Sequence, residues 1–185
     1  MENKKDTNQI IRPSFPNLLL ISGSGRDTGK TRLGCMLIRR WKKKASIAAI
    51  KISPHKHDFG NSMLKLFANE GYTVWQERNR SWKDSGKFFE AGADPVFYVE
   101  AGDLHMYAAF TFTAALCGNN RMIICESGGL VNFVKPGVLV FIQSFEGLPS
   151  AKKERVKAMA DLVITSEEVH TLSGKIEVDH GKWKL

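Results

Sequence analysis

The stretch "ISGSGRDTGKT" (residues 21–31) decides the fold that this sequence predicts. It follows the apolar run "NLLL" and precedes a stretch with helical periodicity, so we place it between a strand and a helix. In that position, the pattern G-x-x-x-x-G-K-[ST] forms a phosphate-binding loop. Gly29, Lys30 and Thr31 match the end of the pattern, whereas Ser24 stands where its first glycine is expected. The loop therefore predicts an anion site with an altered beginning.

This loop contains the residue types that phosphate binding requires. Small residues let consecutive backbone N–H groups turn towards an anion, a lysine reaches the β- and γ-phosphates, and a hydroxyl group ligates magnesium. The residues predicted to bind a nucleotide are Gly25, Arg26, Asp27, Thr28, Gly29, Lys30 and Thr31. Ser24 fits the position of the first glycine if its φ angle is negative. Alternatively, Gly23 takes that role in a loop one residue longer, and the anion site is retained in both arrangements.

Short apolar runs and helical patterns alternate along the chain. The apolar runs are rich in branched and aromatic residues, as in strands buried on both faces; they are 17–22, 46–52, 95–101, 121–127, 137–144 and 160–165. Helical patterns follow the loop, where Leu33, Leu37 and Trp41 recur at i, i+4 and i+8, and occur again over 105–116 and 150–160. The alternation predicts a three-layer α/β fold with a mostly parallel central sheet. Together with the phosphate-binding loop, it indicates a P-loop nucleotide-binding fold.

Two segments depart from this alternation. Residues 53–94 are long and polar, and we expect loops there that reach over the carboxyl edge of the sheet, where α/β domains bind ligands. The tail "SGKIEVDHGKWKL" predicts a small hairpin around residues 179–181 that caps an edge of the sheet. We expect a flexible N-terminal segment over 1–16 and a single nucleotide-binding domain over 17–185.

Composition limits the domain count and the class of partner. A chain of 185 residues, 43% of them hydrophobic and 25% charged, closes one core of ordinary size. The formal net charge of +8 suits an anionic partner, but there is no RNA-binding signature or arginine-rich arm, so nucleic acid is not expected. The three cysteines lack a C-x-x-C pair and predict buried thiols. Without a secretory signal or an apolar segment of membrane-spanning length, we expect a cytoplasmic protein and no membrane partner.

Charged residues at predicted strand ends are candidates for the chemistry. Lys51 ends the second apolar run, so its side chain should emerge at the carboxyl edge beside the loop. Glu126 ends the fourth run and precedes two glycines, and at this place in a P-loop protein a carboxylate holds the water shell of magnesium. We predict catalytic roles for Lys51 and Glu126. A magnesium site is predicted at Thr31 and Glu126, with Asp58 of the loop sequence "PHKHDF" as a further ligand through water.

Two longer stretches resemble a known family. "SIAAIKISPHKHDF", followed by "KDSGKFFEAGADPVFYVEA", is similar to the molybdopterin-guanine dinucleotide biosynthesis protein B family, and the resemblance covers about residues 17–166. "GSGRDTGKT" and "ESGGL" also resemble segments of dethiobiotin synthetase and related enzymes. The resemblance implies a P-loop protein that binds GTP or ATP with Mg²⁺. It implies a slow NTPase adapter in molybdenum cofactor biosynthesis, with a nucleotidyltransferase or a second copy of the chain as protein partner.

The sequence departs from that family at the loop and at two further places. Lys87 stands where the family has an arginine after K-D-S-x, which keeps the charge but loses bidentate recognition. "TSEE" (165–168) stands where related GTP-binding proteins carry the N-K-x-D motif that reads guanine, so the choice between GTP and ATP stays open.

Two other classes of function also stay open. One is a small-molecule kinase or ATP-dependent ligase of the dethiobiotin synthetase type, in which Lys51 and residues 53–94 hold an acceptor. The other is a degenerate relative that serves as an interaction protein.

Overall fold

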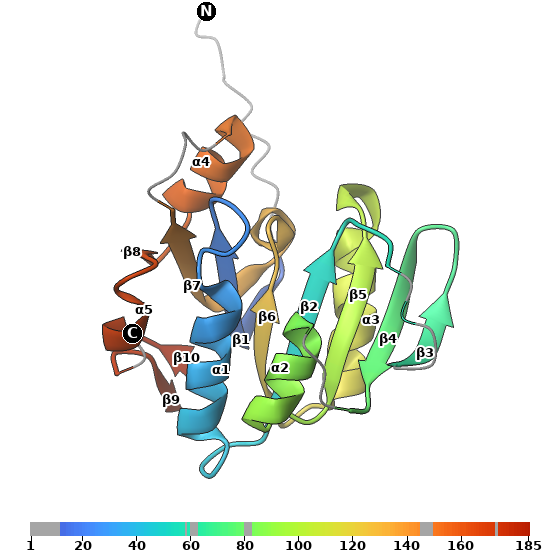
Figure 1. Cartoon of the computed structure of the whole chain (residues 1–185), viewed down its shortest axis with the longest axis horizontal. Coiled ribbons are helices and arrows are strands. Elements are labelled where there is room, and N and C mark those ends of the chain that lie inside the picture. Colours follow the sequence, from blue (N-terminus) through green and yellow to red (C-terminus); the bar gives the residue numbers. More distant parts are fainter. Residues whose placement is uncertain (1–11, 58, 60–62, 80–82, 145–149, 173) are drawn as a thin grey trace, which may run out of the picture.

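The computed structural model contains a central sheet of eight strands with helices on both faces (Figure 1). It describes residues 12–57, 59, 63–79, 83–144, 150–172 and 174–185. The strands of this sheet lie in the order β3-β4-β5-β2-β6-β1-β7-β8, and β9 and β10 form a separate hairpin. The described chain is therefore an α/β fold with one main sheet.

The six predicted apolar runs form the parallel part of the sheet. They are β1 (Ser14–Gly23), β2 (Ile47–Ser53), β5 (Val96–Ala101), β6 (Met122–Glu126), β7 (Lys135–Gln143) and β8 (Leu162–Thr165). β1 pairs with β6 and β7, β2 with β5 and β6, and β7 with β8, all in parallel. The prediction of a mostly parallel sheet is confirmed. β1 already begins at Ser14, within the segment expected to be flexible, and residues 1–11 of that segment lie outside the described residues.

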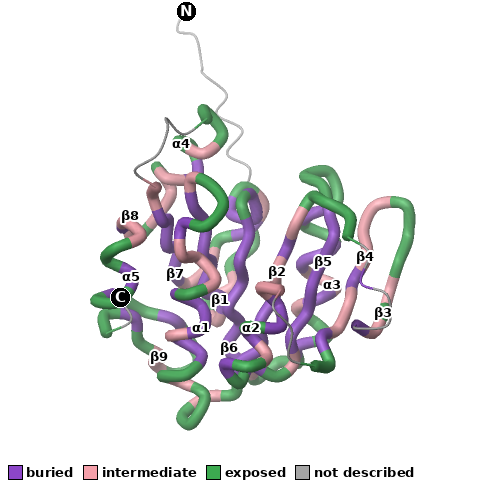
Figure 2. Tube along the Cα trace, viewed as in Figure 1, coloured by how far each residue is buried: buried purple, intermediate pink, exposed green. Residues whose placement is uncertain are grey.

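Alternate residues of the buried strands pack into two cores, one on each face of the sheet. The helices are α1 (Lys30–Trp41), α2 (Asp84–Ala91), α3 (Met106–Cys117), α4 (Ala151–Ala158) and the short α5 (Val169–Leu172). Leu19 and Ile21 of β1 face the core under α1 and α2, whereas Leu18 and Leu20 face the core under α3 and α4. Figure 2 shows the central strands buried along most of their length and the outer surfaces of the helices exposed. Cover on both faces explains why these strands are apolar at consecutive positions.

The segment 53–94, expected to form loops, contains two strands and a helix. β3 (Met63–Ala68) and β4 (Tyr72–Glu77) pair antiparallel with each other, and β4 pairs antiparallel with β5. β3 is the outermost strand and keeps several exposed positions, so no continuous apolar run marks it in the sequence. α2 follows as the third element of the segment. The expectation of loops was wrong for these residues.

The C-terminal hairpin is present but lies on a face of the sheet. β9 (Glu177–Asp179) and β10 (Lys182–Lys184) pair antiparallel around His180 and Gly181, whose φ angles of 47° and 72° are typical of such a tight turn. β10 packs against the interior strands β1 and β7. Trp183 is 2% exposed, and its Nε1 donates a hydrogen bond to the Ile123 carbonyl oxygen at 3.2 Å. The expected role as an edge cap was wrong because the tryptophan anchors the hairpin over the core.

Two expectations about thiols and membranes can be compared with the fold. Cys35, Cys117 and Cys125 are buried and free, as the sequence predicts. Among the described helices, none is both long enough and apolar enough to cross a bilayer.

Candidate functional site

The loop of residues 23–31, hereafter loop 23–31, lies at the carboxyl edge of the parallel strands. β1 ends at Gly23 and α1 begins at Lys30, so the loop joins them over this edge (Figure 1). Lys51 of β2 is paired with Glu126 of β6, and Glu126 is paired with Ile21 of β1. Residues paired in register point to the same face of a sheet, here the face under α1. The structure therefore brings the two predicted strand-end residues together beside the loop.

Gly23 is the glycine that the beginning of the loop requires. A Cβ atom at this position would lie 2.7 Å from the Ile142 carbonyl oxygen and 2.9 Å from Thr28 Oγ1. A Cβ atom at Gly25 would meet nothing within 4 Å, and the φ angle there is not in the left-handed region. The geometry favours the longer loop that begins at Gly23.

Ser24 occupies the next position without strain. Its φ angle is not positive, as the sequence analysis required. Its backbone N–H donates to the Ile142 carbonyl oxygen at 3.0 Å, and its Oγ accepts a hydrogen bond from the Ser144 backbone N–H at 2.7 Å. The hydroxyl thus ties the loop to the end of β7, which a glycine at this position would not do.

The start of α1 presents backbone N–H groups without a capping side chain. Gly29 is the N-cap residue with a left-handed φ angle of 91°, and neither a side-chain cap nor an acidic residue is found in the first turn. The first N–H groups of a helix have no partner within the helix, and the positive end of the helix dipole lies there. This arrangement suits an anion bound against the N-terminus of α1.

Lys30 folds back over the loop. Its Nζ donates hydrogen bonds to the Gly25 carbonyl oxygen and, at 3.0 Å, to Thr28 Oγ1. Burial lowers the pKa of Lys30, and the opposing effect of Glu126 offsets this only in part. Both hydrogen-bond acceptors are neutral, and an ammonium group binds an anionic oxygen more strongly than a neutral one. An anion in the loop would therefore compete effectively for this lysine.

A network of charged and hydroxyl groups joins α1, β2, β6 and α2. Thr31 Oγ1 donates to Glu126 Oε2 at 2.7 Å. Lys51 Nζ forms ion pairs with Glu126 Oε1 and, at 3.0 Å, with Asp84 Oδ2. Glu126 is only 2% exposed, so its carboxylate depends on these partners for compensation.

The pKa shifts of this network follow from its ion pairs. Burial alone would lower the pKa of Lys51, but the charges of Glu126 and Asp84 outweigh it and raise the pKa. Burial would likewise raise the pKa of Asp84, but the adjacent Lys51 ammonium outweighs it and lowers the pKa. Each shift favours the charged form of the group. The network therefore holds a lysine and a carboxylate in their ionised states beside the loop.

Asp84 and Lys153 are site residues to which the sequence analysis assigned no role. Asp84 begins α2, and only the folded chain brings it to Lys51. Lys153 of α4 approaches Gly128, where a Cβ atom would lie 3.1 Å from its Nζ; burial, with a contribution from Lys152, lowers its pKa. The K-D-S stretch quoted for the family resemblance was a signal that could have suggested Asp84, whereas no pattern in the sequence points to Lys153.

The predicted third metal ligand is not placed by the structure. Asp58 lies outside the described residues. The neighbouring His57 belongs to an aromatic cluster, with its Nδ1 2.8 Å from Tyr98 Oη and its ring centroid 5.8 Å from that of Phe59. In the described part of the chain, no group of three His, Cys, Asp or Glu side chains is placed to hold a metal ion. Magnesium would have to be held by Thr31, one or two carboxylates, water and phosphate, which is usual for this ion.

The "TSEE" segment lies beside loop 23–31. Ser166 Oγ donates to the Thr28 carbonyl oxygen at 3.1 Å. The carboxylate of Glu168 accepts hydrogen bonds from the Thr165 backbone N–H at 2.8 Å and from Thr165 Oγ1 at 3.0 Å, and these bonds lower the pKa of Glu168. The segment therefore positions the loop, and the Glu168 carboxylate is engaged by its own turn.

Comparisons of the chain with protein-family models, with curated proteins and with solved structures found no match.

Proposed function

We propose that the chain is a P-loop protein that binds GTP or ATP together with Mg²⁺. One observation carries the proposal. Lys30 and Thr31 begin a helix whose N-terminus has no capping side chain, and the buried carboxylate of Glu126 accepts the Thr31 hydroxyl hydrogen bond at 2.7 Å. A lysine, a hydroxyl and a buried acid in this arrangement are the groups that a triphosphate with magnesium requires.

The phosphates would bind over the N-terminus of α1. Backbone N–H groups of loop 23–31 would surround the β-phosphate, and Lys30 would exchange its two neutral acceptors for phosphate oxygens. The absence of a Cβ atom at Gly23 keeps the loop close to the end of β7. Ser24 supports this geometry through its hydrogen bonds rather than obstructing it.

The donor set beside the loop fits a magnesium ion. The Thr31 hydroxyl and the carboxylate of Glu126 would hold the ion or its water shell, with Asp84 as a second carboxylate within the same network. An ion held by these residues would supply positive charge that offsets the charge of the phosphates. Lys51 Nζ is ion-paired with both carboxylates, so it would hold the side chains of Glu126 and Asp84 in place beside the loop.

We further infer a slow NTPase that works as an adapter in molybdenum cofactor biosynthesis, with a nucleotidyltransferase as partner. The family resemblance of the sequence supports this part of the proposal. Arg26 is the arginine within the loop, and it is exposed. Without a partner that orders it or supplies another cation, charge that develops during phosphoryl transfer would be stabilised weakly, which fits slow turnover.

Nucleotide titrations with Mg²⁺ and with a chelator test the proposal. Lys30→Ala should weaken binding about 10-fold to 100-fold in both conditions, because a hydrogen bond to a charged group contributes about 1.5–3 kcal/mol. Glu126→Gln and Thr31→Ala should retain binding but lose most of the gain that Mg²⁺ gives. Lys43→Ala, in an exposed position after α1, is the matched control for lost positive charge and should bind as the parent does. Equal affinities in Lys30→Ala and Lys43→Ala would overturn the proposal.

A further inference from the structure

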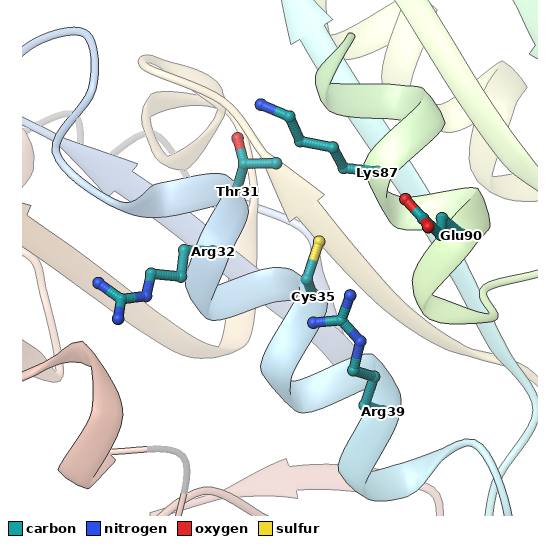
Figure 3. Close-up of a pocket in the computed structure, with 6 residues that line it drawn as sticks. All are labelled: Thr31, Arg32, Cys35, Arg39, Lys87 and Glu90. Atoms are coloured by element: carbon teal, nitrogen blue, oxygen red, sulfur yellow. The ribbon is translucent and has the colours of Figure 1, made fainter. Parts of the chain in front are cut away.

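A cavity of about 250 Å³ opens between α1 and α2, next to the network around Thr31 (Figure 3). It is lined by Thr31, Arg32, Cys35 and Arg39 from α1 and by Lys87 and Glu90 from α2. Thr31 belongs both to this cavity and to the hydrogen-bonded network with Glu126. The cavity is therefore continuous with the candidate site on the side of α2.

The spacing of the two helices that form the walls is fixed by close packing. A Cβ atom at Gly34 of α1 would lie 2.6 Å from Phe88 Cε1 of α2. Phe88 has no exposed surface and belongs to the main core on this face of the sheet. Because interiors are packed densely, this contact holds the helices at one distance. The cavity lies beside this contact.

The side chains around the cavity are mainly cationic. The lining residues include three cationic side chains, two arginines and one lysine, and one carboxylate, that of Glu90. Among the described residues, no carboxylate forms an ion pair with Arg32 or Arg39, and the one ion pair of Lys87 is with Asp84 at 3.4 Å. In Figure 3 the Arg39 guanidinium and the Lys87 ammonium enter the space between the helices, whereas Arg32 extends away from α2. Among the described residues, the Arg39 guanidinium is therefore the cation of this space without a carboxylate partner, whereas Lys87 is paired with Asp84.

Cys35 forms part of the wall as a neutral thiol. Burial raises the pKa of Cys35 to about 11, against the opposing effect of Arg39 and Lys87. The thiol therefore adds no negative charge to the cavity at neutral pH. Cys35 is 6% exposed, whereas Cys117 and Cys125 have no exposed surface, so Cys35 can report on the cavity by its reactivity.

We propose that this cavity binds the phosphate or carboxylate group of a small molecule. The Arg39 guanidinium from α1 lies at the Cys35 end of the cavity and the Lys87 ammonium from α2 extends towards Thr31 (Figure 3). A guanidinium matches planar or tetrahedral oxyanions with paired hydrogen bonds. The volume suits a small anion rather than a whole nucleotide. Anion binding in the cavity does not depend on the proposed function. The further statement that the anion would lie next to a triphosphate bound at loop 23–31 rests on that function.

The rate at which Cys35 reacts with methyl methanethiosulfonate, a small neutral thiol reagent, tests the inference. Mass spectrometry of the peptide that contains Cys35 gives the rate of its modification. The rate is measured at increasing concentrations of inorganic phosphate or of malonate. The experiment uses Lys30→Ala as the parent, because this change weakens any anion site in loop 23–31. We expect at least one anion to slow the modification at millimolar concentration, and the more effective one identifies the preferred group.

Two variants of this parent decide the result. Arg39→Gln should raise the anion concentration that gives half-protection about tenfold or more. Lys43→Gln removes the same charge away from the cavity and should leave the protection unchanged. The inference is overturned if neither anion protects Cys35, if Arg39→Gln is protected as well as the parent, or if Lys43→Gln loses protection equally. If the anions protect Cys35 in the unmodified protein but neither protects it in Lys30→Ala, they bind in the loop and the inference also fails.

Discussion

Alanine at Gly23 and alanine at Gly25 should have opposite effects on the stability of this protein. The two glycines flank Ser24 at the beginning of the loop. In the structure, a methyl group at Gly23 would overlap the backbone carbonyl oxygen of Ile142 at 2.7 Å. A methyl group at Gly25 would meet open space.

The size of the effect can be worked out from these contacts. Backbone atoms cannot turn aside as a flexible side chain can, so β1 and β7 must separate locally. Forcing an extra methyl group into a packed site costs about 1–3 kcal/mol. The same movement strains the hydrogen bond from the Ser24 N–H to Ile142, which contributes about 0.5–1.5 kcal/mol. Gly23→Ala should therefore lower the free energy of unfolding by about 1.5–4.5 kcal/mol. Gly25→Ala should raise it by about 0.4–1 kcal/mol, because alanine restricts the unfolded chain.

Urea unfolding of the two variants measures this difference. We expect a lower midpoint for Gly23→Ala and an equal or higher midpoint for Gly25→Ala, with the m-value unchanged in both. A thermal scan should agree, with a shift of about 2–4 °C per kcal/mol for a chain of this size. Equal midpoints for the two variants, or a larger loss in Gly25→Ala, would refute the reasoning that Gly23 is the required glycine.

Three further predictions concern the site and the C-terminal hairpin. Burial would raise the pKa of Asp84, but Lys51 outweighs this effect and lowers the pKa below the ordinary value of 3.8. The ionised carboxylate therefore stabilises the fold above pH 3.8, and this stabilisation is lost as the pH falls through the folded-state pKa. In Asp84→Asn, the free energy of unfolding measured with urea should fall less steeply between about pH 2 and 4. GTP and ATP should bind with affinities that differ by less than about a hundredfold, because the Glu168 carboxylate already accepts hydrogen bonds from its own turn and is not free to bind guanine. Competition titrations measure the ratio, and a larger preference for GTP would show that another group recognises guanine. Trp183→Ala should lower the free energy of unfolding by about 3–5 kcal/mol, because the ring is buried and its N–H donates a hydrogen bond to the Ile123 carbonyl oxygen. Urea unfolding measures this change, and a decrease below about 1 kcal/mol would show that the hairpin contributes little to the core.

Local patterns were sufficient for the parallel part of the fold. A strand covered on both faces is apolar at consecutive positions, so runs such as "NLLLIS" and "RMIICES" mark β1 and β6 without any knowledge of their neighbours. Helix α1 follows from the recurrence of Leu33 and Leu37, both fully buried. Glu126 ends β6 as predicted, whereas β2 (Ile47–Ser53) continues two residues beyond Lys51. Both side chains still lie near the same edge, because the carboxyl ends of parallel strands meet there. Short-range periodicity carries this information, and the sequence by itself therefore predicted these elements.

Relations between distant segments were decided only by the tertiary structure. β3 and β4 lie at the exposed edge, where burial does not demand an apolar run, so their residues resemble those of a loop. Asp84 becomes part of the site because α2 packs beside β2, which places the carboxylate 3.0 Å from Lys51. The difference between Gly23 and Gly25 depends on the carbonyl group of Ile142, a residue from β7 that is far away in the chain. Each of these results depends on distances across the fold, which no local pattern of residues encodes.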